Sequence, residues 1–504
     1  MEKIASIDAR SGNVLGPVAA PTTPAEVALL TRAAAHAAGW LAGQGRQGRA
    51  RLLNALADGL EARRNEIVTL ADSETALGIG RLDGELTRTC YQLRFMGEVA
   101  VDGGYLNASI EHKGETPAGL RPDLRKTAVP IGPIAVFGAS NFPLAFSVPG
   151  GDTASALAAG CPVVVKAHNS HVGTSALIAQ IFAEVLEARG VPAGVFGIVY
   201  GRDAGVALVT DAAITAVGFT GSLSGGRALF DLASRREVPI PFYGELGSVN
   251  PLIVTEAAAA DRATEIGAGI AASMTLGVGQ FCTKPGLFLI PDTAEGQRLI
   301  ETLAKGLSEI DPGYLLNDGI RDAFNSGIQA TTLAGTEVLF NRTPSGRTTT
   351  PVLVEAGVDE VTGTGRHVLL EERFGPFGLV TRYRNLDELF AVLDAMPAAL
   401  TGTLHTGAGD PVTIAISQKL EKRSGRVVFN GYPTGVAVAW GMHHGGPYPA
   451  STASAVTSVG AAAISRWIRP VSFQDAPQDA LPDELKNEPE HPISRRINGH
   501  LTIS

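Results

Sequence analysis

Length, composition and charge narrow what this chain can be. It has 504 residues, more than one hydrophobic core usually supports, so we expect two or three domains. A net charge of −9 argues against a general nucleic-acid or membrane surface, and three widely spaced cysteines without ligand-like spacing predict no disulfide scaffold and no metal site. The cysteine usage and the absence of a signal-peptide pattern predict a cytoplasmic protein.

The first part of the chain reads as helical. Residues 24–70 combine a Thr-Pro start signal with amphipathic spacing, and "GELTRTCYQLRFMGEVAV" predicts a further helix. Residues 105–127 are polar and predict a hairpin or an extended excursion. Residues 127–151 carry no charge, but prolines interrupt them, so we expect a buried strand, a turn and a helix rather than a membrane span.

Strand and helix patterns then alternate from residue 131 to about 245, beginning with "GPIAVFG" and "CPVVVKA". Continuous apolar strands separated by helices are typical of a doubly wound parallel sheet. The alternation resumes from about 246 to 430, which predicts a second α/β domain. Residues 427–465 contain no Asp, Glu, Lys or Arg and fit either an inter-domain wall or a pocket wall. The polar tail from 475 predicts a loosely ordered segment or one that wraps a partner subunit.

Ligands of open α/β sheets bind beyond the carboxyl ends of the strands, which directs attention to the residues there. "GFTGSLSGG" places Gly221 and Ser222 at a helix start, where backbone N–H groups can hold a phosphate; an ordinary helix cap is the alternative. Lys166 ends a buried strand and could donate to ribose or phosphate oxygens. Asn169 stands where many sites carry an acid that repels a 2′-phosphate, so the pattern favours NADP over NAD. Arg202 could pair with that phosphate or be a solvated loop residue.

Three further residues have chemistry that suits a reaction at a carbonyl carbon. Asn141 lies in an apolar turn and could donate to an oxyanion or only to the local backbone. Glu245 ends an apolar run, and we expect burial to raise its pKa into the range of a general base, with a solvent-facing glutamate as the alternative. Cys282, in the tight "GVGQFCTKPG" segment, is either a small buried filler or a nucleophile.

Taken in order, the motifs "GASNFP", "VVVKAHNSH", "GFTGSLSGG", "ELGSVNP", "GQFCTKPG" and "EERFGPF" resemble the aldehyde dehydrogenase superfamily over residues 20–475. The forms "FGASNFPLAFS", "HGGPYPAS" and "RWIRPVSFQ" resemble its NADP-dependent branch, which contains 2-oxoglutarate semialdehyde (2,5-dioxovalerate) dehydrogenases and a bacterial fatty aldehyde dehydrogenase. The resemblance implies an α/β fold with a Rossmann-like cofactor domain (residues 1–107 and 129–245), a catalytic domain (246–450) and an oligomerisation extension (108–128 and 451–504).

The resemblance also implies roles. Cys282 would attack the aldehyde and pass through a thiohemiacetal and a thioester, Asn141 and the Cys282 N–H would hold the oxyanion, and Glu245 would activate water. Lys166 would bind the adenosine ribose, and Gly221 with Ser222 the pyrophosphate. Glu372 would hold the nicotinamide ribose and Phe374 would pack beside the nicotinamide. The cofactor is expected to be NADP, with NAD as the alternative, and the chain a homodimer or homotetramer.

The resemblance predicts that the substrate is 2-oxoglutarate semialdehyde, which is oxidised to 2-oxoglutarate. Arg88 and Gln92 share a helix face that lines the substrate tunnel in the resembled family, so Arg88 is the candidate partner of a distal carboxylate, with a surface or interface salt bridge as the alternative. Phe142, preceded by "Ser-Asn" where the family commonly has "Trp-Asn", is expected to border the tunnel. His443 and His444 could line its entrance. Aliphatic aldehyde oxidation is the nearest alternative, and a cysteine esterase without a redox cofactor is a more distant one.

Overall fold

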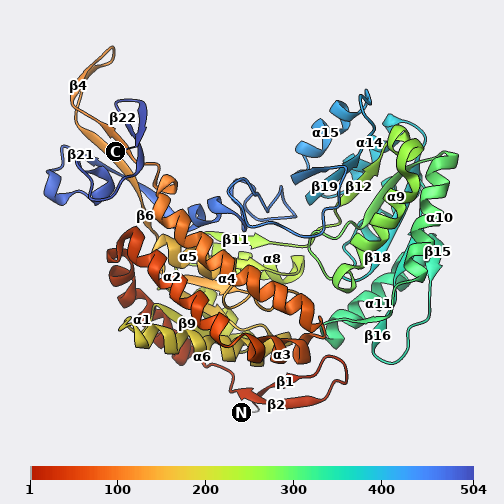
Figure 1. Cartoon of the computed structure of the whole chain (residues 1–504), viewed down its shortest axis with the longest axis horizontal. Helices are drawn as coiled ribbons and strands as arrows, with labels where there is room; N and C mark the ends of the chain where they lie inside the picture. The colour runs from red at the N-terminus through yellow and green to blue at the C-terminus, as the bar shows by residue number, and fades with distance from the viewer. Residues whose placement is uncertain (1–2, 504) are drawn as a thin grey trace.

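The structure, a computed structural model that describes residues 3–503, has two α/β lobes and an arm that projects from the first lobe (Figure 1). The first lobe contains a parallel sheet in the order β11-β10-β7-β8-β9. Its strands are β7 (Ile134–Phe137), β8 (Val163–Lys166), β9 (Phe196–Val199), β10 (Ala216–Thr220) and β11 (Phe242–Glu245).

Both faces of this sheet are covered by helices, as its uninterrupted apolar strands require. In β7, Ile134 and Val136 enter a core shared with several helices, whereas Ala135 and Phe137 face a separate core on the opposite side. The first core draws side chains from α2 (Gly45–Ala62), α4 (Ile79–Asp102), α5 (Gly151–Ala159) and α6 (Val172–Ala188), and also from α1 (Pro24–Gly43) and α3 (Arg64–Thr75). The second core contains α1, α7 (Arg202–Thr210) and α8 (Leu223–Ser234). Helix α3 packs beside α4 and α6.

The second lobe is built on a larger sheet in the order β15-β17-β18-β13-β12-β19-β20, in which only the edge strand β15 runs antiparallel. Its strands are β12 (Pro251–Val254), β13 (Leu287–Pro291), β15 (Glu337–Asn341), β17 (Val352–Glu355), β18 (Phe377–Tyr383), β19 (Ala399–His405) and β20 (Ser424–Phe429). Alternation again divides the core: Leu287 and Leu289 face one side, and Phe288 and Ile290 the other.

The helices of the second lobe follow the same division. Helices α9 (Glu256–Thr275) and α10 (Ala294–Ser308) cover one face of the sheet. The opposite core draws side chains from α11 (Asp318–Leu333), α12 (Val358–Thr362), α13 (Arg366–Leu369), α14 (Leu386–Ala395) and α15 (Thr413–Glu421). Two short strands, β14 (Gly313–Tyr314) and β16 (Thr348–Thr349), pair beside them. Together the two lobes confirm the predicted α/β fold.

The arm combines two distant parts of the chain in one sheet, in the order β21-β6-β3-β22-β23. It contains β3 (Ser109–Glu111), β6 (Leu124–Pro130), β21 (Ile468–Gln474), β22 (Ser494–Ile497) and β23 (His500–Ile503), and the hairpin β4 (Gly114–Thr116) and β5 (Gly119–Arg121) forms its tip (Figure 1). The predicted excursion at 105–127 is thus an ordered part of the arm. The tail after 475, predicted to be loose or to wrap a partner, folds back here through two short 3₁₀ turns and the hairpin β22–β23.

The segment that leads into the arm belongs to the first lobe. Ala461, Ile464 and Trp467 are buried in the core formed with α5, and the indole N–H of Trp467 donates to Ser155 Oγ at 2.8 Å. The C-terminal strands of the arm begin only at Ile468, later than the division at 451 suggested by the resemblance. At the opposite end of the molecule, β1 (Ile4–Ile7) and β2 (Val14–Ala19) form a separate hairpin. Among the described residues, no helix is long and apolar enough to cross a membrane.

Candidate active site

A cavity of about 1140 Å³ is lined by residues of both lobes. The first lobe contributes the loops that follow β7, β10 and β11, which is the carboxyl edge of its sheet. This edge is where an open α/β sheet binds its ligand, because the crossovers leave a crevice there. The cavity wall includes many of the predicted site residues, namely Asn141, Gly221, Ser222, Glu245, Cys282, Glu372 and Phe374.

Cys282 is held in a loop whose backbone is tightly constrained. The preceding turn contains Gly279 with φ +68°, and a side chain there would meet the carbonyl carbon of Gly375 at 2.4 Å, so only glycine fits. On the other side of the cysteine, Asn250 Nδ2 donates to the carbonyl oxygens of Cys282 at 2.7 Å and Lys284 at 3.0 Å. Asn250 is completely buried, and these bonds fix the position of the thiol against β12.

Two N–H donors belong to the cavity wall that contains the thiol. Asn141 follows β7, is 6% exposed, and donates from Nδ2 to the carbonyl of Gln280 at 2.8 Å, which leaves its second amide N–H for another acceptor. Within residues 3–503, nothing accepts a hydrogen bond from the backbone N–H of Cys282. An amide and a free backbone N–H flanking a sulfur are the donor set that a tetrahedral oxyanion requires.

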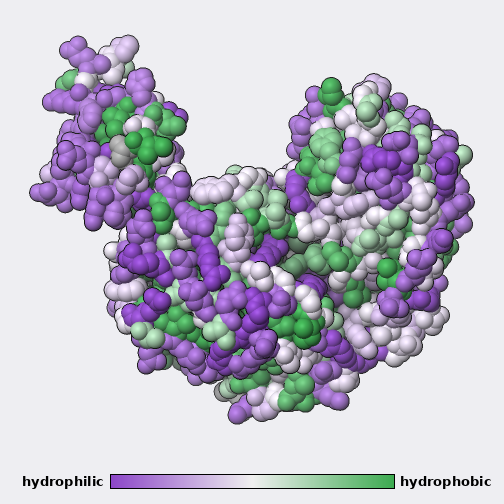
Figure 2. Space-filling view, in the orientation of Figure 1, coloured by the Kyte–Doolittle hydropathy of each residue, from purple (hydrophilic) through white to green (hydrophobic). Residues whose placement is uncertain are grey.

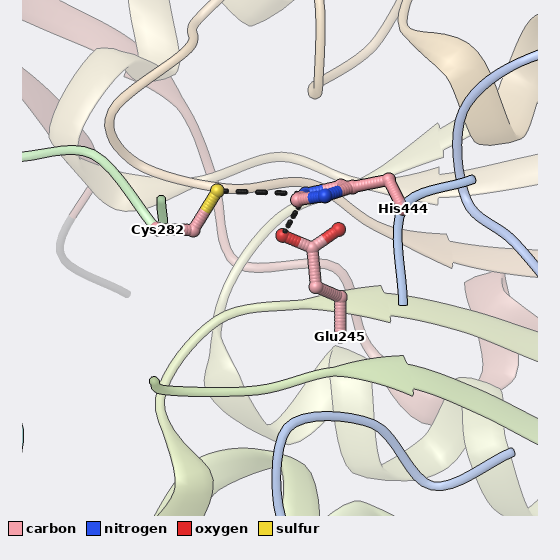
Figure 3. A group of neighbouring side chains, drawn as sticks. All are labelled: Glu245, Cys282 and His444. Carbon is pink, nitrogen blue, oxygen red and sulfur yellow. Dashed lines mark hydrogen bonds and ion pairs between the residues drawn. The ribbon is translucent and has the colours of Figure 1, made fainter. Parts of the chain in front are cut away.

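Glu245 lies at the end of β11 and bonds to two residues from a distant loop, of which Figure 3 shows His444. His444 Nε2 lies 2.8 Å from its Oε1, and Ser458 Oγ donates to its Oε2 at 2.8 Å. Burial alone would raise the pKa of Glu245, but the attraction of His444 and the hydrogen bonds to the carboxylate lower it. The expectation of a raised pKa is therefore wrong, because the sequence did not reveal the histidine partner.

The same histidine contacts the thiol. Its Nε2 lies 3.6 Å from Cys282 Sγ, so one ring nitrogen stands between the sulfur and the carboxylate (Figure 3). Burial and the negative charge of Glu245 raise the pKa of Cys282 well above its ordinary value. In this arrangement the resting cysteine is a thiol, and the carboxylate of Glu245 is the nearby acceptor for its proton, because His444 Nε2 donates to that same carboxylate.

The role of His444 was underestimated from the sequence, which placed both histidines of "GMHHGGPYP" at an entrance. His444 is only 1% exposed and lies within the catalytic cluster, while its neighbour His443 is half-buried and belongs to no cluster with the thiol. The sequence did contain a signal for this position. Residues 427–465 have no Asp, Glu, Lys or Arg, so a buried histidine in this segment must find its polar partners in other parts of the chain. Ser458 comes from the same segment, which therefore contributes to the site wall.

One end of the cavity has the properties of a phosphate site. Ser222 is the N-cap of α8 and accepts from the backbone N–H of Gly225 at 3.2 Å, while the N–H of Gly221 donates to the carbonyl of Glu245 at 3.1 Å. The cap and phosphate interpretations of Ser222 are compatible, since the first N–H groups of α8 have no partner within the helix. The cavity volume of about 1140 Å³ exceeds the usual range for one small ligand.

Glu372 and Phe374 line the same cavity from the second lobe. Burial raises the pKa of Glu372, and the nearby positive charge of Lys284 opposes that shift. Lys284 is also buried, and its Nζ donates to the carbonyl of Phe377 at 2.9 Å. A side chain at Gly247 would meet Glu372 Oε2 at 2.4 Å, so the carboxylate lies against the backbone that follows β11.

Three predicted cofactor residues lie near the sheet edge but not in the cavity wall. Lys166 ends β8, and its Nζ donates to Asn169 Oδ1 at 3.3 Å. Burial lowers the pKa of Lys166 to about 8. Arg202 is the first residue of α7 and is exposed.

The predicted substrate residues lie behind the thiol, on or beside α4. The guanidinium of Arg88 packs 5.2 Å from the ring centre of Phe146, and the charges of Cys282 and Glu245 both act on it. Gln92 Nε2 donates to the carbonyl of Ala145 at 3.2 Å, and Phe142 forms a buried cluster with Ala145 and Phe281. Like Arg88, these two side chains are outside the cavity wall.

Comparison with known proteins agrees with this geometry. Residues 1–467 match the model of the aldehyde dehydrogenase family. The chain is 44% identical over 459 residues to alpha-ketoglutaric semialdehyde dehydrogenase 2 of Azospirillum brasilense, covering 90% of this chain and 87% of the relative. It is 39% identical over 465 residues to alpha-ketoglutaric semialdehyde dehydrogenase of Acinetobacter baylyi, covering 90% and 88%.

Solved structures show the same fold at lower sequence identity. Aldehyde dehydrogenase C of Pseudomonas syringae, in a mutant form with NAD⁺ and octanal, matches with a TM-score of 0.80 at 20% identity over 94% of this chain and 93% of its own. NADP-dependent glyceraldehyde-3-phosphate dehydrogenase of Bacillus halodurans, with NADP, matches with a TM-score of 0.80 at 21% identity over 94% and 96%. The chain belongs to the aldehyde dehydrogenase family.

Proposed function

We propose that this protein oxidises 2-oxoglutarate semialdehyde to 2-oxoglutarate with NADP as the hydride acceptor. The observation that carries the chemistry is the convergence of Cys282, Asn141 and Glu245 on one cavity. The substrate is supported by the two relatives of about 40% identity, both named for the same semialdehyde, and by a buried arginine beside the thiol.

The first step forms a bond between Cys282 Sγ and the aldehyde carbon. The thiol proton leaves as the bond forms, and the carboxylate of Glu245 is positioned to take it and to release it to solvent before the thioester is hydrolysed. The carbonyl oxygen gains negative charge, which the second N–H of Asn141 and the backbone N–H of Cys282 stabilise. The product is a thiohemiacetal whose carbon still carries its hydrogen.

Ser222 and the N-terminus of α8 would hold the pyrophosphate of the dinucleotide, and Glu372 would hold its nicotinamide ribose. When bound, its nicotinamide supplies the acceptor for the hydride of the thiohemiacetal carbon, which leaves a thioester on Cys282. Glu245 then takes a proton from a water that attacks the thioester carbon, and the carboxylic acid leaves as the thiol reforms. The lowered pKa of Glu245 keeps this base ionised at neutral pH.

The choice of NADP depends on charge at the adenosine end. Asn169 adds no negative charge where an acid would repel a 2′-phosphate, and Lys166 beside it is a cation below about pH 8. Arg202 is the first residue of α7. The aliphatic chain of Lys166 lies against Gly205 of the same helix, so α7 packs beside this lysine. Comparing kcat/KM for NADP and NAD with one aldehyde tests this choice, and a higher value with NAD would reject it.

Arg88 is the residue that fits the distal carboxylate. Its Nε and Nη2 are buried, and no hydrogen-bond partner for either atom is found among the described residues. A buried guanidinium with unsatisfied N–H groups is costly unless a ligand pairs with it. Glu85, one turn earlier on α4, partly offsets the positive charge of Arg88. One of its carboxylate oxygens, however, already accepts hydrogen bonds from the N–H groups of Leu144 and Ala145.

A panel of aldehydes with NADP, followed through the absorbance of the reduced cofactor, tests the substrate. We expect the charged semialdehyde to have the highest kcat/KM, and saturation by a medium- or long-chain aliphatic aldehyde alone would support the aliphatic alternative instead. Hydrolysis of an ester without reduction of the cofactor with any aldehyde would support the esterase alternative.

The variant Arg88→Met should lower kcat/KM for the semialdehyde by roughly 10- to 150-fold, the value of a charged hydrogen bond, with little change for an uncharged aldehyde. The matched control is Arg94→Met on the same helix, because Arg94 is paired with Asp58 on the surface at 2.8 Å. An equal loss with both aldehydes in Arg88→Met would remove Arg88 from substrate recognition.

We also infer that the arm mediates assembly into a homodimer or homotetramer. Figure 2 shows the arm standing clear of the two lobes, with hydrophobic surface among hydrophilic surface. Leu501 and Ile503 in β23 are 67% and 79% exposed, and Leu120 in β5 is 68% exposed. Light scattering on the intact chain and on the variant Leu501→Lys, Ile503→Lys tests this, and a monomeric intact chain would refute it.

A further inference from the structure

Three kinds of metal ligand meet at the thiol, although they are far apart in the sequence. Cys282 Sγ, His444 Nε2 and one oxygen of Glu245 lie within 4.8 Å of one another, each from a different segment (Figure 3). The histidine is 162 residues from the cysteine and 199 from the glutamate, so no spacing pattern could have revealed the group.

The two distances from His444 Nε2 to the other ligand atoms are close to those of a tetrahedral zinc site. With bond lengths of about 2.3 Å to sulfur and about 2.0 Å to nitrogen and oxygen, tetrahedral angles place sulfur and nitrogen roughly 3.5 Å apart and nitrogen and oxygen roughly 3.3 Å apart. The structure has Sγ and Nε2 3.6 Å apart and Nε2 and Oε1 2.8 Å apart. The carboxylate would move away from the imidazole by about half an ångström as the ion replaces their hydrogen bond.

We propose that this group binds Zn²⁺ reversibly and that the bound ion inhibits the enzyme by occupying the nucleophile. The thiol of Cys282 releases its proton to solvent and binds as the thiolate, His444 binds through the Nε2 lone pair with its proton on Nδ1, and Glu245 binds as the carboxylate. No electron is transferred, and a water molecule fills the fourth position. Thiolate and imidazole select zinc over magnesium and calcium, which prefer oxygen ligands.

Two features make the site weaker than a structural zinc centre. His444 Nδ1 is buried, and none of the residues in 3–503 forms a hydrogen bond with it, whereas zinc-bound histidines generally donate their second N–H to an acceptor. The positive charge of Arg88 also acts on both Cys282 and Glu245 and opposes a cation there. Ser458 helps the site by holding the second oxygen of Glu245. We therefore expect binding that a chelator reverses.

Metal titration of the purified, chelator-treated full-length enzyme tests the proposal without relying on activity. Co²⁺ serves as the probe, because cobalt bound to a thiolate gives a charge-transfer absorption in the near ultraviolet. We expect one equivalent per chain to produce this band and added Zn²⁺ to remove it. In parallel, Zn²⁺ should abolish aldehyde oxidation, and ethylenediaminetetraacetate should restore it.

Variants distinguish this site from adventitious binding. Cys282→Ser should eliminate the cobalt band, His444→Phe should weaken cobalt binding at least tenfold, and the neighbouring control His443→Phe should retain wild-type affinity. Thermal melts establish that each variant is folded. A band that persists in Cys282→Ser, or equal affinities in the two histidine variants, would overturn the proposal. Absence of aldehyde oxidation would count against the proposed function alone, since the titration would still report the metal site.

Discussion

Replacement of His444 by phenylalanine should shift the pH dependence of turnover. The side chain has similar size but cannot donate to Glu245 Oε1, so the carboxylate keeps its burial and loses its strongest stabilising partner. Without that partner the pKa of Glu245 rises, because burial favours the protonated acid. A protonated Glu245 cannot take a proton from water, and thioester hydrolysis slows.

The magnitude follows from the lost interaction. A hydrogen bond to a charged group contributes about 1.5 to 3 kcal/mol, which corresponds to roughly 10- to 150-fold in the acid dissociation equilibrium of the carboxyl group. In the acidic part of the profile, kcat of His444→Phe should fall by that factor, and it should recover at alkaline pH, where Glu245 ionises again. Steady-state kcat measured across pH with saturating aldehyde and NADP provides the test.

A second variant separates this effect from a general disturbance of the loop. His444→Gln retains an N–H donor, so its profile should lie between those of the wild type and His444→Phe. If both variants had the wild-type profile, the interaction at 2.8 Å would not control the proton affinity of Glu245. A uniform loss at every pH would instead indicate that His444 only supports the local structure.

Three further outcomes are expected. Glu245→Gln should release one equivalent of reduced cofactor per chain in a stopped-flow burst and then turn over slowly. Loss of the negative charge of Glu245 lowers the pKa of Cys282, so attack continues without this acceptor, while deacylation loses its base. Steady turnover without a burst would contradict the assigned base. The KM for NADP should rise as pH increases through about 8, where Lys166 loses its charge, and Lys166→Arg should have a flatter KM profile. Asn250→Ala should lower the free energy of unfolding in urea by roughly 2 to 6 kcal/mol, because the carbonyls of Cys282 and Lys284 lose their buried donor at about 1 to 3 kcal/mol each; a loss below about 1 kcal/mol would show that the loop is stable without these two hydrogen bonds.

Local sequence patterns were sufficient for the strands, the helices and the constrained turn that contains Cys282. Uninterrupted apolar strands such as Ile134–Phe137 identify a sheet covered on both faces, because every second side chain must enter a different core. The glycines around Cys282 indicate a constrained turn, since Gly279 has a positive φ and a close backbone neighbour. These properties depend on residues near in sequence, which is why they could be predicted.

The proton chemistry of the site was decided only by the tertiary structure. Burial of Glu245 could be anticipated from its apolar strand, but the direction of its pKa depends on His444 and Ser458, which reach it from a loop about 200 residues later in the chain. The same is true of the position of the C-terminal tail, which pairs with β3 across the arm. Sequence alone determined which segments form strands, helices and the reactive turn. Only the folded chain determined which charges meet, because electrostatic interactions depend on distance in space and on burial rather than on separation along the chain.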